Sequence, residues 1–299
     1  MFIIKNKKIF IGISIVLVIA SIILLSVFGL KVGIDFKGGA ITEVAYEADR
    51  PVQADIDSAL KTADFGSAVV QPTGDKGYIV KSLSLDEAQH AQLLKILSQD
   101  GKFKMEEKSF NSIGPSVGKE LAKKAIIAII LVSLGIIIFI AFAFRKVSKP
   151  VSSWRYGIIA VISLLHDVII PVGFFTIFNH YFGAEMDTLF VVAVLTILGL
   201  SVSDTIVIFD RIRENLRNRV ETSFNETVGK SLEQSYVRSI CTSLTVILVL
   251  LSLFFFGPSS TRYFSLMLTV GMFFGTYSSI FLASPLLVLV EEWQTKKKK

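Results

Sequence analysis

The sequence predicts a polytopic α-helical membrane protein with six transmembrane helices and a small α+β ferredoxin-like external domain between spans 1 and 2. Three observations support this fold class. Hydrophobic residues make up 52% of the 299 residues, and the mean hydropathy is +0.62. Uncharged runs long enough to cross ~30 Å of hydrocarbon recur along the chain. Residues 31–124 are instead hydrophilic and nearly neutral, with 13 Lys plus Arg against 14 Asp plus Glu.

The first uncharged run, residues 9–30, follows three lysines and predicts an uncleaved transmembrane helix. A signal peptide has a similar outline, but its apolar core is only about 7 to 15 residues long and a small-residue cleavage site follows it. We therefore assign residues 1–30 to a cytoplasmic N-terminus and the first span. The single cysteine, Cys241, excludes an intrachain disulfide.

Residues 31–124 alternate strand-like and amphipathic patterns and predict a separate α+β domain. The turn-rich sequence PTGDKG separates two strands, and Ser84 with Glu87 gives an S-x-x-E capping box for the second helix. The order β-α-β-β-α-β is that of a ferredoxin-like domain. The expected strands are 41–46, 68–71, 78–83 and 102–110, and the expected helices are 51–62 and the segment from the capping box to about 99.

Five further uncharged runs predict a transmembrane bundle over residues 125–290, with spans at 125–144, 157–179, 188–209, 239–257 and 263–290. Lys and Arg concentrate before the first span, in loops 145–155 and 211–238, and in the basic tail 291–299. The opposite short loops contain only Arg262. The positive-inside rule then places both termini in the cytoplasm and residues 31–124 outside. The net charge of +6 thus indicates topology and not nucleic-acid binding.

In the cytoplasmic segment 211–238, apolar residues recur every four positions from Ile212 to Tyr236. Each such step advances about 40° beyond a full helical turn, so one straight helix cannot hold them on one face. We expect two short amphipathic helices that part near residues 221–223 and lie on the membrane surface. A solvated basic loop is the alternative.

Asp204 is the most informative residue because it lies inside the fourth span. An ionised Asp near the centre of a span costs about 2.5 to 3.5 kcal/mol, so the carboxyl needs a partner, water or a proton. Arg238, where the fifth span begins on the same side, is a candidate counter-charge for a carboxyl that titrates when water reaches it. Two structural alternatives remain: Ser201 and Ser203 hold Asp204, and Arg238 reaches lipid phosphate.

His166 and Asp167 lie near the middle of the third span. Polar residues there usually face the bundle interior and mark a pathway. The alternative is a core histidine with a structural Asp partner. Pro171, about one turn later, frees a backbone carbonyl and predicts a kink toward this pair.

Four ordered signatures carry a family resemblance. The sequence GIDFKGGA follows the first span, the His166–Asp167 pair lies in the third, and Arg238 opens the fifth. Residues 201–215 read SVSDTIVIFDRIREN. Together they make nearly the whole chain similar to the SecF members of the SecD/SecF family of protein-export membrane proteins. Ser203 stands where many relatives have Asn. The motif residues are Asp35, Phe36, Gly38 and Gly39 at the junction, Ser201, Asp204 and Thr205 in the membrane, and Phe209, Asp210, Arg211, Arg213 and Glu214 in the cytoplasm.

The resemblance implies a proton-driven accessory of protein secretion in the bacterial cytoplasmic (inner) membrane, related to the resistance-nodulation-division superfamily. Asp204 would be the protonatable group and Arg238 its charged neighbour. The implied partners are SecD, the SecYEG translocon, a translocating preprotein and membrane lipid. Protons are the expected coupling ion and no cofactor is expected, although Na⁺ stays open because a carboxylate with hydroxyl neighbours serves either ion.

Two other function classes stay open. A half-transporter for a lipid or small amphiphile would use the same buried charges, and a passive assembly scaffold would need no titration. An enzyme is not expected, because the sequence contains no nucleophile triad, phosphate-binding loop or metal-ligand spacing.

Overall fold

The computed structural model describes residues 2–143, except 64, 66 and 67, and residues 151–298. The chain divides into two compact units. One combines residues 1–31 with 127–299, and the other covers 32–126, against the predicted domain 31–124. The predicted fold class is confirmed, because the described residues form six helices long and apolar enough to cross a membrane and one small antiparallel sheet.

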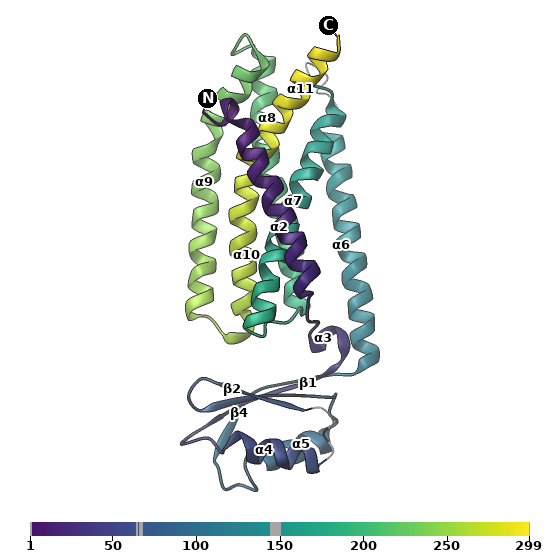
Figure 1. Cartoon of the computed structure of the whole chain (residues 1–299), viewed down its shortest axis with the longest axis vertical. Coiled ribbons are helices and arrows are strands. Elements are labelled where there is room, and N and C mark those ends of the chain that lie inside the picture. The colour runs from purple at the N-terminus through teal and green to yellow at the C-terminus, as the bar shows by residue number, and fades with distance from the viewer. Residues whose placement is uncertain (1, 64, 66–67, 144–150, 299) are drawn as a thin grey trace. The chain divides into compact units, whose positions relative to one another are not determined.

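The helical unit begins with the short α1 (Phe2–Lys5) and contains the six membrane-length helices, with its N and C ends at the same end of the bundle (Figure 1). The sixth span is α10, which continues through a π-helical turn, η1, into α11. The bounds are α2 (Lys7–Phe28), α6 (Pro115–Ala143), α7 (Ser153–Tyr181), α8 (Thr188–Arg217), α9 (Phe224–Phe256), α10 (Ser259–Ser278), η1 (Ser279–Ala283) and α11 (Ser284–Lys298).

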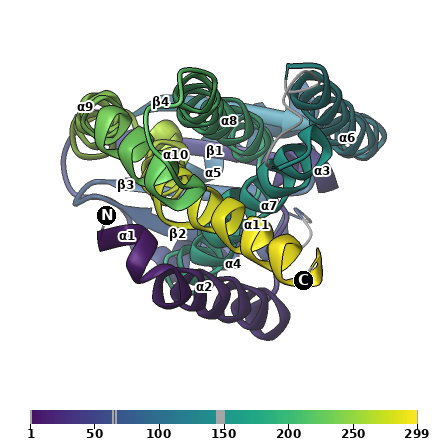
Figure 2. The same cartoon turned by 90° about the horizontal axis from the view of Figure 1, so that it is seen from above.

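Helix α10 is central to the bundle and packs against α7, α8 and α9, while α2 packs on α7 (Figure 2). Glycines permit this close approach. A Cβ at Gly271 would lie 2.3 Å from a side-chain carbon of Ile197, and one at Gly173 would lie 2.4 Å from the Ser21 Cβ. Small residues at helix contacts let backbones approach closely, and dispersion contacts hold helices together where lipid supplies no hydrophobic driving force.

The break predicted near residues 221–223 is confirmed, because α8 ends at Arg217 and α9 begins at Phe224. The prediction of two separate helices on the membrane surface is wrong, because the two segments are extensions of the spans. Their apolar residues meet each other: Ile212 on α8 and Val228 and Leu232 on α9 are buried. The apolar residues that recur every four positions therefore form the contact between two antiparallel helices and do not face the membrane. A solvated loop is excluded by the same burial.

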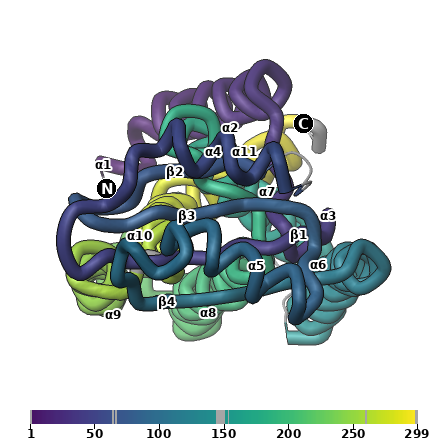
Figure 3. The backbone as a smooth tube through the Cα atoms, turned by 90° about the horizontal axis from the view of Figure 1, so that it is seen from below, coloured from purple at the N-terminus to yellow at the C-terminus, as the bar shows by residue number. Residues whose placement is uncertain are grey.

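The α+β unit is a four-stranded antiparallel sheet in the order β2-β3-β1-β4, with α4 and α5 on one face (Figure 3). This is the strand order of the predicted ferredoxin-like domain. Its core joins Val44 and Val80 of the sheet to Ile56 of α4 and Leu93 of α5. The bounds are β1 (Gly39–Tyr46), α4 (Gln53–Thr62), β2 (Val69–Thr73), β3 (Gly77–Ser82), α5 (Glu87–Leu97) and β4 (Met105–Ile113).

The cap of α5 corrects the predicted Ser84–Glu87 capping box. Asp86 is the N-cap: its Oδ1 accepts the Gln89 N–H at 2.8 Å, and Gln89 Oε1 accepts the Asp86 N–H at 3.0 Å. Ser112 of β4 explains the later start, because its hydroxyl accepts from the Leu85 N–H at 2.9 Å and donates to the Leu85 carbonyl at 3.0 Å. Leu85 is thus held beside the strand and cannot join the helix.

The GIDFKGGA sequence forms one helical turn, α3 (Ile34–Lys37), and then two glycines with positive φ. Asp35 and the buried Phe36 belong to that turn. Gly38 has φ +81°, and a Cβ there would lie 2.7 Å from the Pro115 Cα; Gly39 has φ +141°. The two glycines are needed where the chain turns into β1 beneath the start of α6.

Replacing Gly38 by Ala should destabilise the α+β unit by about 1–3 kcal/mol, because the backbone conformation is strained for Ala and the new methyl meets backbone. Gly74→Ala is the matched control, since Gly74 also has positive φ (+53°) but faces open space. Hydrogen exchange of the β1 amides in the full chain measures the difference. Equal protection in the two variants would contradict the close contact with Pro115.

Candidate functional site

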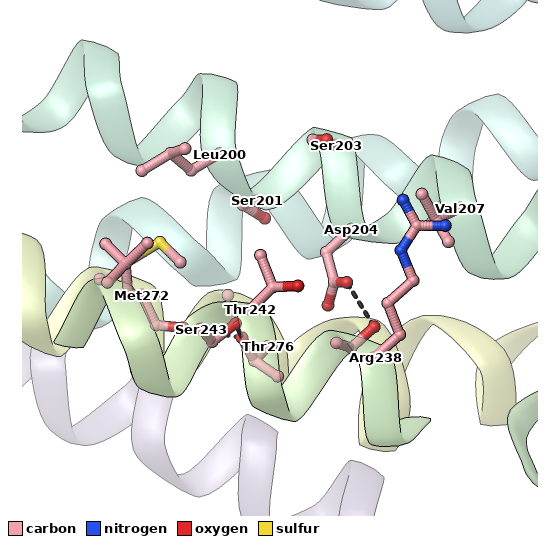
Figure 4. A pocket seen from close by; sticks show the side chains of 14 residues that line it. Leu200, Ser201, Ser203, Asp204, Val207, Arg238, Thr242, Ser243, Met272 and Thr276 are labelled. Atoms are coloured by element: carbon pink, nitrogen blue, oxygen red, sulfur yellow. Dashed lines mark hydrogen bonds between the residues drawn. The ribbon is translucent and has the colours of Figure 1, made fainter. Parts of the chain in front are cut away.

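Asp204 projects from α8 toward α9 at a cavity of about 140 Å³ within the helical unit (Figure 4). Its Oδ1 accepts a hydrogen bond from Ser239 Oγ at 2.5 Å, and its buried Oδ2 has no hydrogen-bond partner among the described residues. A carboxylate oxygen without a donor in a low-dielectric site is costly unless water or a proton reaches it. The cavity supplies room for several waters, since one water needs only about 10–15 Å³ of such space.

Arg238, also on α9, lines this cavity and an adjacent one of about 240 Å³. In the described part of the chain it forms no direct ion pair with Asp204, but its charge is near enough to interact with the carboxylate. Figure 4 places its guanidinium beside Val207. The adjacent cavity runs past Asp210, Arg211 and Glu214 of α8. Arg238 therefore separates the Asp204 cavity from the charged end of the α8–α9 hairpin.

The hydroxyl residues of α8 have different roles. Ser203 lines the Asp204 cavity. Ser201 donates its hydroxyl to Asp167 on α7, and Thr205 shares a 2.8 Å hydrogen bond with Ser279 of η1. The alternative in which Ser201 and Ser203 hold Asp204 is not what the structure shows, because Ser239 makes that bond.

His166 and Asp167 form a fully buried polar cluster next to this cavity. His166 Nδ1 lies 2.8 Å from Asp167 Oδ1. Asp167 Oδ2 accepts one hydrogen bond from the Ser201 hydroxyl and another, at 2.7 Å, from the Ser278 hydroxyl. One carboxyl thus joins α7, α8 and α10. His166 is 3% exposed and Asp167 0%, although neighbours on a helix are about 100° apart. The interior position predicted for both residues is what the structure shows.

The motif residues 209–215 lie near the C-terminal end of α8. Phe209 is buried against Tyr156, with ring centroids 5.3 Å apart and planes at 87°. The charged residues pair on the surface, Asp210 with Arg213 and Arg211 with Glu214. Asn215 is buried and donates to Ser231 Oγ and Gln234 Oε1 of α9, both at 2.8 Å. The motif therefore joins α8 to α9 and α7 at the end nearest Arg238.

Sequence reasoning missed Ser239, Ser278 and Ser279, and it included Asn215 in the 201–215 motif without assigning it a contact. Serines in apolar helices usually return their hydroxyl to a carbonyl of the preceding turn, so their presence alone carries little information. A weak signal existed for Ser239 and Ser243, which are four residues apart and share one helix face. Ser239 bonds Asp204 of α8, and Ser243 bonds Thr276 of α10 at 2.5 Å, so this face of α9 makes polar contacts with both helices.

The family model for the protein export membrane proteins SecD/SecF, C-terminal, matches residues 92–293. The chain belongs to the SecD/SecF family. Among SecD/SecF relatives, the protein translocase subunit SecF of Thermobaculum terrenum is 45% identical, and the match covers 98% of this chain and 94% of that protein. The subunit SecF of Anaerolinea thermophila is 36% identical, with 98% and 95% covered.

SecD/SecF relatives that carry the combined name SecDF are longer. The protein translocase subunit SecDF of Bacillus subtilis is 34% identical over 98% of this chain, which spans 38% of that protein. The crystal structure of SecDF from Thermus thermophilus, described as a translocon-associated membrane protein, superposes with a TM-score of 0.80 at 30% identity. That match covers 97% of this chain and 38% of the SecDF chain.

Replacing Asn215 by Ala should loosen the α8–α9 hairpin by about 1–3 kcal/mol, because a buried hydrogen-bonded amide is lost and Gln234 Oε1 loses its donor. Hydrogen exchange of backbone amides 208–217 in the full chain should then accelerate. Glu214→Gln is the control, since it removes only an exposed ion pair with Arg211. Unchanged exchange in Asn215→Ala would show that the hairpin does not depend on this amide.

Proposed function

We propose that this chain is a SecF-type subunit of the protein-export machinery and that, with SecD, it uses the proton-motive force to promote preprotein translocation through the SecYEG translocon. The observation that carries the proposal is Asp204, a carboxyl within a membrane span that faces a cavity and a nearby guanidinium. Family membership supports the export role, and the SecDF relatives support a SecD partner.

The proton step follows from the geometry of Asp204. A proton that binds Oδ2 removes the negative charge, so the attraction to Arg238 and the charge-assisted bond from Ser239 both weaken. Helices α8 and α9 are then free to shift along their contact. Each charge that crosses 100 mV supplies about 2.3 kcal/mol, which is enough for one or a few protons to bias two arrangements of packed helices.

The same proposal places the protein in the bacterial cytoplasmic membrane with both termini in the cytoplasm and the α+β domain outside. The distribution of Lys and Arg supports this orientation. Many apolar side chains on α2, α6 and α9 are exposed in the isolated chain, which fits contact with lipid or with SecD. We further propose that the shift of α8 and α9 is transmitted to the external domain, which acts on the translocating preprotein.

The Asp204 cavity bears on the half-transporter alternative. Ligand pockets usually enclose about 300–1,000 Å³, whereas this cavity has about 140 Å³. It suits water and a small ion better than a lipid or amphiphile. H⁺ is the proposed coupling ion, and Na⁺ dependence of export would assign the carboxyl to that ion instead.

Asp204→Asn should abolish the part of export that depends on the proton gradient, because a side-chain amide does not gain or lose a proton as a carboxyl does. The measurement is export of a secreted reporter, with and without an uncoupler, from cells with matched protein levels. Glu233→Gln is the control, since Glu233 lies outside the motif and pairs with Lys230 on the surface of α9. Ser239→Ala should give an intermediate loss. Normal gradient-dependent export in Asp204→Asn would leave the passive scaffold as the better description.

A further inference from the structure

We propose that His166 and Asp167 form a second proton-binding site inside the bundle, coupled to Asp204 through Ser201. The proposal rests on the proposed proton-dependent function of Asp204. It adds the His166–Asp167 pair, which has no part in the proton step described for Asp204. The pair is fully enclosed by protein, unlike Asp204, which faces a cavity. Three donors from α7, α8 and α10 converge on the Asp167 carboxyl.

Charge balance is the first argument. If His166 is neutral and donates Nδ1–H to Asp167, an ionised Asp167 leaves a net charge of −1 among membrane helices. Uncompensated buried charge is costly even when it accepts hydrogen bonds. One further proton on the Asp167 carboxyl makes the pair neutral overall.

The second argument is the unused nitrogen of His166. Its Nε2 is buried and has no hydrogen-bond partner among the described residues. The ring stacks on Tyr277 at a centroid distance of 6.1 Å and meets the edge of Phe274 at 6.4 Å. A histidine that served only to hold Asp167 would need Nδ1 alone, and a structural site would normally satisfy or replace the other nitrogen. Because Nε2 has no partner in the described part of the chain, His166 keeps its proton on Nδ1, and the additional proton of the pair lies on the Asp167 carboxyl.

Ser201 supplies the connection to Asp204. Its hydroxyl donates to Asp167, and the same residue lines the Asp204 cavity. Ser201 and Asp204 are three residues apart, so they lie on one face of α8. A protonated Asp204 can pass its proton through a cavity water to Ser201 Oγ while Ser201 passes its own hydroxyl proton to Asp167. Asp204 then becomes a carboxylate, Ser201 stays neutral, and the pair gains one proton.

The two carboxyls are also linked through Ser201, which donates to Asp167 and lies three residues before Asp204 on α8. Two carboxylates that share a region of low dielectric do not ionise independently, so a proton on one favours ionisation of the other. The other titratable or charged side chains near the pair in the described chain are Tyr277 on α10 and, across the cavity, Arg238 on α9. We infer that the bundle holds one proton in either of two places, one hydrated and one enclosed.

The experiment is a pH titration of the full chain in lipid nanodiscs, followed by the infrared band of protonated carboxyls and by ¹⁵N NMR of histidine. The chain has three histidines, so His90→Gln and His180→Gln assign the His166 signals. As the pH falls, the band of one buried protonated carboxyl should appear, and the His166 ¹⁵N signals should shift with it because Nδ1–H then donates to a neutral carboxyl. Asp167→Asn should remove that carboxyl band.

Milder variants test the coupling without removing the carboxyl. Ser201→Ala removes a donor to the carboxylate, so the protonated band should persist to higher pH. Asp204→Asn removes a negative neighbour, so the band should appear only at lower pH. Ser163→Ala is the control, since Ser163 is buried on the same helix and its hydroxyl has no partner in the described structure. It should shift neither signal.

Three outcomes would overturn the proposal: no protonated-carboxyl band at any pH at which the chain stays folded, no shift of the band in Ser201→Ala and Asp204→Asn, or signals that follow Na⁺ concentration instead of pH. These spectra are recorded without translocation. A normal titration together with normal export by Asp204→Asn would therefore refute the proposed function while leaving the proton site in place.

Discussion

The bundle is organised by the cost of placing ionisable groups in hydrocarbon. Asp167, Asp204 and His166 lie within the spans. Asp167 accepts from serines of α8 and α10, Asp204 accepts from a serine of α9, and His166 bonds Asp167 on its own helix. Few helix pairs can meet this requirement at once, so the polar groups fix which faces of α7, α8, α9 and α10 meet. Dispersion contacts alone would permit many more arrangements of such apolar helices.

Glycine makes these polar contacts geometrically possible. Gly275 of α10 faces Ser201, and a Cβ there would lie 3.3 Å from the Ser201 Cβ. Ser278, three residues later on α10, donates to the same carboxyl as Ser201. The absence of a side chain at Gly275 thus lets two serines from different helices reach one acceptor. The close spacing of α8 and α10 at Gly275 and the two hydrogen bonds to Asp167 therefore depend on each other.

Charge and hydropathy predicted the fold class, the six spans and the two intramembrane acids, because these features depend only on local composition. The serine partners of those acids could not be predicted, since a serine is uninformative until its helix is placed against another. The surface-helix prediction for 211–238 failed for the same reason: an apolar stripe is equally suited to lipid and to a second helix. The α5 cap was misplaced by two residues because tertiary bonds from Ser112 held Leu85 outside the helix.

The π-helical turn η1 determines what the C-terminal segment can contact. A π turn accommodates one residue more than an α turn, so every side chain after Ala283 is rotated by about 100° from the register set by α10. That rotation directs Glu292 of α11 to Lys7 at 2.5 Å and to Asn225 at 3.1 Å. The single inserted residue thus acts as an angular offset, by which one continuous span presents one face to the buried acids and another to the first turns of α2 and α9.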